Sequence, residues 1–477
     1  MCSSKVDYIE GDTIAAIATP IGSSGIGIIR ISGERAADIA GSLFTPIADS
    51  DCVSDSMALE KIASHKLKHG YIRDPSNGSI IDEILLVIMR APHSYTREDV
   101  VEIQSHCGPV ILSKILKLVI AYGARMAMPG EFTRRAFLNG RIDLSQAEAV
   151  GEMISARSEA ALNIAVTHLT GHMRDEIYKI TQKITELQIA LEAEVEFGDE
   201  LSNSVSQENA AGSKIQNEMI DPVKRLIDQY KEGYMLRDGI RLGIAGRPNV
   251  GKSSLLNILM RKDRAIVTPF PGTTRDLIEE AVNIDGVHFL VSDTAGLHTA
   301  IDPVEKIGIQ KTKEHIRQTD LILFMVDASE PFISGDDNAF EQIDTENAVV
   351  LINKIDLVNE KSKIQVPSKY RHYPVVHISA KYGQGIENLK TKIKEAVFNG
   401  ITIETGRHIV PTLRQKHGLE SALNDLKRAK QCVESSLGDE LVLMDLASAK
   451  EALNEIVGNN VSQDLLDDIF SKFCIGK

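Results

Sequence analysis

A short string near the middle of the chain constrains its fold more than any other feature. Residues 246–253 read GRPNVGKS, a match to the pattern GxxxxGK[ST], and they stand between an apolar run and a helical stretch. In such a loop, glycines let backbone N–H groups wrap a phosphate, and the following helix adds the positive end of its dipole. The string therefore predicts a strand, a phosphate-binding loop and a helix in succession.

The side chains of this loop suit a nucleotide that carries magnesium. We predict that Lys252 reaches the β and γ phosphates and that Ser253 ligates Mg²⁺. The same string can arise by chance as an ordinary glycine turn, but the flanking strand and helix argue against that here. The predicted nucleotide contacts in the loop are Asn249, Val250, Gly251, Lys252, Ser253 and Ser254.

Three later strings each end an apolar, strand-like run: DTAG at 293–296, NKID at 353–356 and SAK at 379–381. Because ligands of parallel sheets bind at the carboxyl ends of the strands, we expect these strings to join the phosphate loop. The Asp356 carboxylate can accept two hydrogen bonds from guanine that adenine does not offer. Four strings in this order resemble the Ras-like GTPases. The nucleotide contacts predicted from the last three are Asp293, Thr294, Ala295, Gly296, Asn353, Lys354, Asp356, Ser379, Ala380 and Lys381.

The residues that activate water depart from the common GTPase pattern. Leu297 follows DTAG, where many Ras-like enzymes place a glutamine that orients the attacking water. An isobutyl group cannot do this, and Glu305 and Asp302 are both candidates for an acidic replacement. Asn249, together with residues 268–274, could surround a monovalent cation with oxygens. Asn249 could equally cap the backbone of its own loop, and the residues alone favour neither role over the other.

Patterning outside the loop predicts several domains. Residues 13–32 indicate a hairpin, and strand-like runs at 80–89 and 100–104 precede a helix near 109–122, which together predict an α+β domain. Residues 236–400 alternate strand-like and helical stretches, which predicts a mostly parallel sheet.

Long helices are predicted on both sides of that sheet. Apolar residues recur at spacings of three and four over 177–191, 220–230 and 419–426. We therefore expect a multidomain α/β and α+β protein in which a Ras-like parallel-sheet domain is inserted into a discontinuous helical domain.

Composition limits the function. The net charge is −14, so any RNA contact has to be local, since proteins that grip nucleic-acid phosphates usually present a basic face. Arg134, Arg135 and Arg141 form either one small basic cluster or part of a solvated charged face. No apolar run approaches the ~20 residues of a membrane span, and the amino terminus lacks a signal-like apolar core, so we expect a cytoplasmic protein. The five cysteines show no CxxC spacing, which argues against a disulfide framework and a zinc site.

Three further strings extend the resemblance beyond the GTPase region. They read PGEFT at 129–133, RAFLNGRIDL at 135–144 and FCIGK at 473–477. With the GTPase strings, they make the chain similar to the tRNA uridine-modifying GTPases of the MnmE (TrmE) family from about residue 12 to the final lysine.

The resemblance implies three domains. They are a tetrahydrofolate-binding and dimerisation α+β domain, expected at 1–125, a discontinuous helical domain, expected at 126–235 and 401–477, and the inserted GTPase domain, expected at 236–400.

The resemblance also implies ligands for the GTPase domain. Potassium would be surrounded by Asn249, Thr268, Phe270 and Thr273, magnesium would be ligated by Ser253 and Thr274, and Glu305, rather than Asp302, would position water. The nucleotide contacts implied in the segment after the first helix are Thr268, Pro269, Phe270, Pro271, Gly272, Thr273 and Thr274.

For folate, the resemblance indicates Arg30, Glu102 and Arg141, with Lys477 nearby. Paired donors and acceptors of this kind suit a pterin edge and a glutamate tail. Cys474 is a candidate nucleophile or general acid/base beside the folate, and its alternative role is that of a small residue that fixes the tail.

The function implied is addition of an aminomethyl or carboxymethylaminomethyl group to C5 of the tRNA wobble uridine. A homodimer would share this work with an FAD-containing partner of the MnmG (GidA) type in a heterotetramer or larger complex. The carbon would come from a 5,10-methylene or 5-formyl tetrahydrofolate and the nitrogen from glycine or ammonium. GTP hydrolysis, stimulated by potassium and by pairing of two GTPase domains, would drive a conformational cycle. The rival reading is a ribosome-assembly or regulatory GTPase without modification chemistry.

Overall fold

The computed structural model describes residues 11–20, 22, 24–47, 62–197, 211–263, 280–284, 286–293, 319–341, 347–358, 367, 370–398 and 409–477. The chain divides into two compact units. The first unit comprises residues 1–151, 169–198 and 439–477, and the second comprises 152–168 and 199–438. The domain limits predicted above stay predictions.

The first unit contains a seven-stranded sheet in the order β3-β4-β5-β6-β2-β1-β7. Neighbouring strands are antiparallel except for β7, which runs parallel to β1. The predicted hairpin is confirmed, since β1 and β2 pair directly. The strands are β1 (Ile14–Ile17), β2 (Ile26–Ser32), β3 (Phe44–Pro46), β4 (Leu67–Arg73), β5 (Ile80–Met89), β6 (Val100–His106) and β7 (Arg125–Met126).

Two helices, α1 (Ala36–Leu43) and α2 (Pro109–Ala121), bury their apolar sides in the core with this sheet. The sequence had predicted the second of them. Leu112 and Val119 of α2 join Ile29 and Ile103 of the sheet in that core. Pro109 suits the first turn of α2, where its missing N–H has no helical partner to lose.

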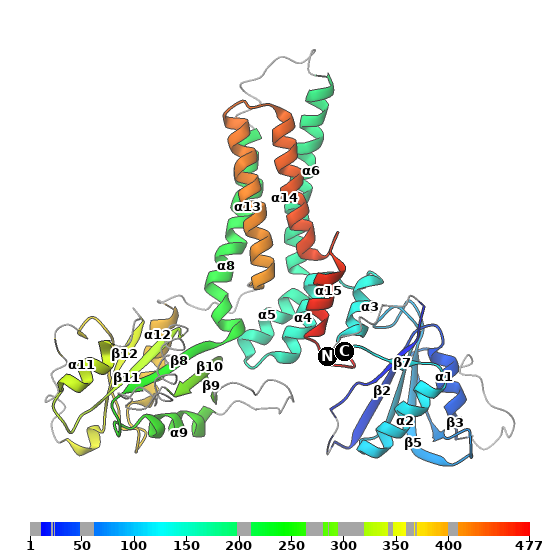
Figure 1. The fold of residues 1–477 in the computed structure, drawn as a ribbon, viewed down its shortest axis with the longest axis horizontal. Coiled ribbons are helices and arrows are strands. Elements are labelled where there is room, and N and C mark those ends of the chain that lie inside the picture. The colour runs from blue at the N-terminus through cyan, green and yellow to red at the C-terminus, as the bar shows by residue number, and fades with distance from the viewer. Residues whose placement is uncertain are drawn as a thin grey trace, which may run out of the picture. The chain divides into compact units, whose positions relative to one another are not determined.

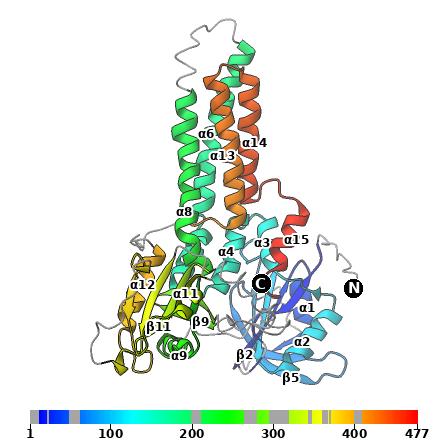
Figure 2. The same ribbon diagram turned by 60° about the vertical axis from the view of Figure 1, so that its left-hand side comes forward.

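The remaining helices of this unit include a long pair. Helix α6 packs along α14, although most of the chain separates them in sequence, and the two lie side by side in both Figure 1 and Figure 2. The shorter α15 contacts α3. These helices are α3 (Glu131–Leu138), α4 (Leu144–Ser155), of which only residues 144–151 belong to this unit, α6 (His172–Phe197), α14 (Asp439–Val457) and α15 (Gln463–Ser471).

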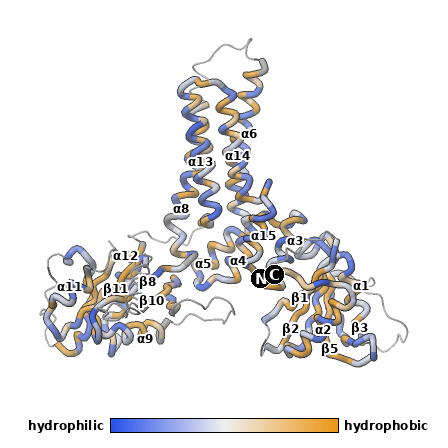
Figure 3. Tube along the Cα trace, in the orientation of Figure 1, coloured by the Kyte–Doolittle hydropathy of each residue, from blue (hydrophilic) through white to orange (hydrophobic). Residues whose placement is uncertain are grey.

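The second unit contains a six-stranded sheet in the order β13-β12-β11-β8-β10-β9. All neighbours are parallel except β9 and β10, which confirms the mostly parallel sheet. Strands β11 and β12 are buried throughout, as expected for the centre of a parallel sheet, and they colour as hydrophobic in Figure 3. The strands are β8 (Ile240–Gly246), β9 (Glu280–Ile284), β10 (Val287–Asp293), β11 (Leu321–Asp327), β12 (Ala348–Asn353) and β13 (Val375–His377).

Helices cover both faces of this sheet. Leu255 of α9 (Lys252–Asp263) and Leu389 of α12 (Ile386–Phe398) enter one core, whereas Phe340 of α11 (Ser334–Glu341) enters another. The unit also contains α5 (Glu159–Leu169), the π-helix η2 (Ile215–Ile220) and the short 3-10 helix η3 (Ile355–Leu357).

Helices α8 (Asp221–Asp238) and α13 (Leu413–Glu434) show that the sheet is an insertion. They pack against each other, although the six-stranded sheet lies between them in sequence. Helix α13 begins at a capping box, in which Thr412 and Gln415 satisfy each other's backbone N–H groups. The predicted fold class is therefore confirmed. Among the described residues, none of the helices has the length and apolarity required to cross a bilayer.

Candidate nucleotide and folate sites

The phosphate loop has the predicted strand–loop–helix form. Strand β8 ends at Gly246 and helix α9 begins at Lys252. Between them Asn249 has φ +63° and Gly251 has φ +108°, both in the left-handed region. A Cβ on Gly251 would lie 2.3 Å from Nδ2 of Asn353, so only glycine fits.

Lys252 lies over the loop that precedes it. Its Nζ donates to the carbonyl oxygens of Gly246 at 2.8 Å and Arg247 at 2.9 Å. Ser253 and Ser254 are exposed in the first turn of α9, where the helix presents its free N–H groups. The loop thus gathers an ammonium group, two hydroxyls and a helix amino terminus, which is a donor set suited to phosphate oxygens.

Asn353 ties two loops of the site together. Its side chain is 2% exposed. The Nδ2 atom donates to Val250 O at 2.7 Å, and Oδ1 accepts from Ala380 N at 2.9 Å. Both polar ends of the amide are used within the protein, so Asn353 holds the phosphate loop against the loop that contains SAK.

The other residues of NKID are positioned by neighbouring side chains. Asp356 is exposed, and its Oδ1 accepts from Ser379 Oγ at 2.6 Å. Lys354 has φ +66°, and its Nζ lies 2.5 Å from Oδ2 of Asp327. Burial by itself would raise the pKa of Asp327, but hydrogen bonds from Lys354 and Ser329 outweigh it and hold that pKa below its usual range.

Asp327 is a site residue that the motifs did not reveal. It is the last residue of β11, the strand between the two that carry the phosphate loop and NKID. An acidic residue that ends a fully apolar run was the available signal. Asp293 likewise ends β10, and Asn353 ends β12. Parallel neighbours therefore bring these residues to one edge of the sheet, as predicted.

Several predicted residues lie outside the described residues. They are Thr268, Pro269, Phe270, Pro271, Gly272, Thr273, Thr274, Thr294, Ala295, Gly296, Leu297, Asp302 and Glu305.

Arg30 and Glu102 meet across two strands of the first unit. They are direct partners in the antiparallel register of β2 and β6. Arg30 Nε donates to Glu102 Oε1 at 2.9 Å, and NH2 of the same guanidinium lies 2.7 Å from that oxygen. The guanidinium carbon also lies 5.7 Å from the ring centroid of the buried Phe132. The pair is therefore half-buried and held in one orientation.

Arg141 reaches the same neighbourhood through Tyr95. Its NH1 donates to Tyr95 O at 2.9 Å, and its guanidinium carbon lies 4.7 Å from the Tyr95 ring centroid. Arg30 lies 6.0 Å from the same centroid. The Tyr95 hydroxyl shares a 3.0 Å hydrogen bond with Thr133. Arg30 and Arg141 therefore both lie beside one tyrosine, which the sequence had not indicated, and Glu102 joins them through its ion pair with Arg30.

The carboxyl-terminal tail completes this group. Phe132 N donates to Lys477 O at 3.2 Å, and Arg30 NH1 donates to Gly476 O at 3.3 Å. Gly130 N donates to Cys474 O at 3.3 Å, and the Cys474 side chain is exposed. The backbone of Cys474 thus fixes the tail, while its thiol stays accessible.

Both interpretations of the three arginines, a basic cluster and a solvated charged face, are wrong for Arg134 and Arg135. Arg134 is 5% exposed and pairs with Asp467 at 2.9 Å, and Arg135 is 1% exposed. Arg135 forms ion pairs with Asp12, Glu98 and Glu131. Both guanidiniums are internal, because carboxylates from distant segments neutralise them. Of the predicted trio, only Arg141 is exposed.

Comparison with known proteins decides the family. A model of the MnmE helical domain matches residues 144–474, and one of the GTP-binding protein TrmE N-terminus matches residues 13–141. The tRNA modification GTPase MnmE of Carboxydothermus hydrogenoformans is 43% identical over 98% of this chain and 99% of its own length. This chain belongs to the MnmE family of tRNA modification GTPases.

A further MnmE protein and a solved structure are also similar to this chain. The protein of Moorella thermoacetica is 42% identical over 98% of this chain and 99% of its own length. Among solved structures, that of an Era variant from Aquifex aeolicus bound to GDP and AlF4⁻ is 26% identical, with a TM-score of 0.29, and it covers 39% of this chain and 66% of that chain. As an MnmE family member, this chain is a GTP hydrolase that binds GTP with Mg²⁺.

Proposed function

We propose that this chain couples GTP hydrolysis to addition of an aminomethyl or carboxymethylaminomethyl group to C5 of the tRNA wobble uridine. The observation that carries the proposal is membership of the MnmE family over 98% of the chain. A group of folate-type donors and acceptors around Tyr95 and the tail supports it. We propose domain limits at residues 125, 235 and 400, a homodimer, and an FAD-containing MnmG-type partner.

Guanine selection is proposed for Asp356. Its carboxylate is exposed toward solvent, and the hydrogen bond from Ser379 restricts its orientation. Two N–H groups of guanine can donate to such a carboxylate, whereas adenine offers it no matching pair. Asn353 contributes indirectly, because its buried amide keeps the base-binding and phosphate-binding loops in register. Lys354, Ala380 and Lys381 complete the proposed base pocket.

The phosphate end is proposed to use Lys252, the loop backbone and two cations. Lys252 would exchange its loop carbonyls for the β and γ phosphate oxygens. The Ser253 hydroxyl, exposed at the start of α9, fits a magnesium ligand, with Thr274 as the second. Magnesium, when bound, neutralises charge on the phosphates.

Potassium is proposed to lie beside Asn249. This residue is exposed and held at φ +63°, so its side-chain oxygen is free of the buried interior. Thr268, Phe270 and Thr273 are the other proposed ligands, and Glu305 is proposed to position water in place of the missing glutamine. We expect replacement of potassium by sodium to reduce GTP hydrolysis sharply. Equal rates in the two salts would exclude a catalytic role for the ion.

Folate is proposed to bind beside Arg30, Glu102 and Arg141, with Lys477 at the edge. The Arg30–Glu102 pair offers both a donor and an acceptor to a pterin edge, and Tyr95 offers an aromatic face. Arg141 is exposed and can reach the glutamate tail of a folate. The exposed thiol of Cys474 is then the proposed nucleophile or general acid/base.

Nucleoside analysis of tRNA tests the function directly. In a strain that lacks this gene, we expect the C5 modification to disappear from the wobble uridine and to return when the wild-type gene is supplied. A Lys252→Ala gene should fail to restore it, because the phosphate loop is then without its ammonium group. Normal tRNA with defective ribosome assembly would instead favour the ribosome-assembly GTPase.

A further inference from the structure

A hollow of about 240 Å³ lies in the second unit, away from the nucleotide loops. It is formed by the end of α4 and the segment that leads into α5, by the end of α8 and by β10. Helices α4, α5 and α8 and strand β10 are labelled in Figure 1. Its lining residues are Ser155, Arg157, Ser158, Ala161, Arg237, His288 and Leu290.

His288 is the buried polar group of this hollow. The residue is 5% exposed, and neither ring nitrogen has a hydrogen-bond partner among the described residues. Burial, together with the positive charge of Arg157, lowers the pKa of His288 to about 4, so the ring is neutral at pH 7 and carries one N–H donor. Buried polar groups are normally hydrogen-bonded, so this ring calls for a partner that enters the hollow.

The charge around His288 is positive. Arg157 is exposed at the hollow, and no carboxylate in the described parts of the chain pairs with it. Arg237 donates to Pro411 O at 2.6 Å, and its Nε lies 3.9 Å from Oε1 of Glu152. The lining itself therefore contains two guanidiniums and no carboxylate.

Helix α5 adds to this positive potential. The helix begins at Glu159, and Ser158 before it accepts a hydrogen bond from Ala161 N at 3.0 Å. The positive end of the helix dipole therefore faces the hollow, because Ser158 and Ala161 both line it.

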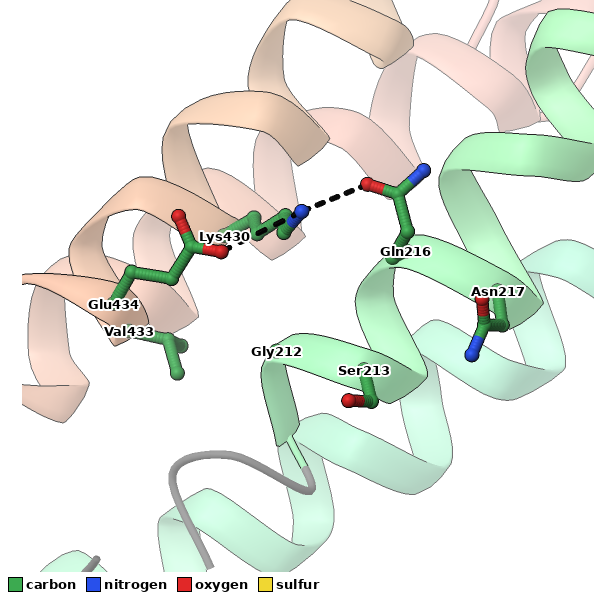
Figure 4. Close-up of a pocket in the computed structure, with 7 residues that line it drawn as sticks. All are labelled: Gly212, Ser213, Gln216, Asn217, Lys430, Val433 and Glu434. Carbon is green, nitrogen blue, oxygen red and sulfur yellow. Dashed lines mark hydrogen bonds and ion pairs between the residues drawn. The ribbon is translucent and has the colours of Figure 1, made fainter.

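A second hollow in the same unit differs in this respect. It lies between η2 and the end of α13, and Figure 4 shows that its cation, Lys430, interacts with Gln216 and Glu434. Lys430 Nζ donates to Gln216 Oε1 at 2.9 Å and lies 3.5 Å from Oε1 of Glu434. That hollow has its own carboxylate and needs no anion, which distinguishes it from the hollow at His288.

We propose that the hollow at His288 is a binding site for a small oxyanion of the phosphate type. Arg157 and the start of α5 would supply charge, and the His288 N–H would donate to one oxygen. A volume of about 240 Å³ is below the ~300 Å³ of the smallest usual small-molecule pockets, so a phosphate group fits and a whole nucleotide does not. The bound ion would fasten α5 to β10, the strand that ends at Asp293.

Phosphate binding by the full-length protein tests this site. The protein is first saturated with GDP and Mg²⁺, so that the phosphate loop is occupied, and labelled inorganic phosphate is then added in equilibrium dialysis. We expect one further phosphate per chain. Arg157→Gln should weaken that binding about tenfold or more, because a charge-assisted hydrogen bond is lost. Arg225→Gln, the same change at an exposed position of α8, is the matched control and should leave it unchanged.

A second measurement places the ion at His288. In protein with ¹⁵N-labelled histidine, phosphate should shift the ring resonances of His288, which a His288→Gln variant identifies, and should leave the exposed His417 unchanged. If sulfate displaces the labelled phosphate and AMP does not, the natural ligand is a free ion. If AMP also displaces it, the site can take the phosphate group of a larger ligand. Either result upholds an oxyanion site. Absence of saturable binding, equal weakening in both arginine variants, or an unshifted His288 would overturn the proposal.

Discussion

The two sheets of this protein assemble their candidate sites in different ways. In the parallel sheet, Gly246, Asp293 and Asn353 each end a strand, so the direction of the strands alone gathers them at one edge. In the antiparallel sheet, Arg30 and Glu102 lie within strands, and the carboxyl-terminal tail completes the group through Gly476. In the parallel sheet, the position of a residue at the end of its strand is thus enough to place it in the site. The antiparallel site depends instead on the register of two strands and on the distant carboxyl-terminal tail.

The largest expected effect separates the two sites. If the tail serves only the antiparallel site, Cys474→Ser should abolish the tRNA modification and leave GTP hydrolysis nearly intact. Nucleoside analysis and phosphate release measure the two activities on the same preparation. Cys432→Ser, which changes a cysteine of α13 that is not in a disulfide, is the control and should retain both activities. Normal tRNA modification by the Cys474→Ser variant would show that the thiol has no catalytic role. Loss of GTP hydrolysis together with modification would show that the two sites depend on each other.

The next effect concerns the base at the edge of the parallel sheet. Asp356→Asn should weaken GTP binding by at least about 100-fold, because one of the two accepting oxygens becomes an NH2 donor that faces an N–H donor of guanine. Xanthosine triphosphate should bind the variant better than GTP does, since its extra carbonyl accepts from the new amide. Calorimetry measures both affinities. Asp320→Asn, at the opposite end of the sheet beside Arg241, should bind GTP normally. Unchanged GTP affinity in Asp356→Asn would refute the proposed base contact.

A smaller effect tests the antiparallel site. Arg30→Gln should weaken binding of 5-formyltetrahydrofolate about 10- to 100-fold, because the cationic donor beside Glu102 is lost. Arg73→Gln changes an arginine of the same sheet that contacts Tyr71 and Gly78, and it should bind folate as the wild type does. Calorimetry with each variant makes the comparison. Equal folate affinities of the two variants would show that folate does not bind at Arg30.

The smallest effect concerns stability in the second unit. Burial, and then the charge of Arg237, lower the pKa of His168 to about 4, so the folded state resists a proton that the unfolded state takes up below its pKa of about 6.5. The contribution of the neutral His168 to the free energy of unfolding is therefore fully present above about pH 6.5 and is lost as the pH falls toward 4. From pH 7 to pH 5.5 the loss should be about 1 kcal/mol.

His168→Leu tests the origin of that loss. The variant should lose less stability than the wild type over the same pH interval, as measured by urea unfolding, because its residue 168 takes up no proton. His417→Gln, which replaces an exposed histidine of the same unit, should keep the wild-type dependence. Identical dependence in all three proteins would show that His168 does not control it.

The sequence by itself determined the phosphate loop, the order of the nucleotide strings and the inserted parallel sheet. These follow from local rules, because apolar runs define strands, glycines define the loop, and parallel strands bring their carboxyl ends together. The family likeness indicated Arg30, Glu102 and Arg141, which patterning alone did not.

Only the tertiary structure decided which charges are exposed and which distant segments meet. It buried Arg134 and Arg135 among carboxylates, and it gave Asn353 the role of a brace between two loops. It also joined the tail to Arg30 and left His288 without a partner among the described residues. The physical reason is that burial and pairing depend on neighbours from remote parts of the chain, and no spacing within a single segment encodes them.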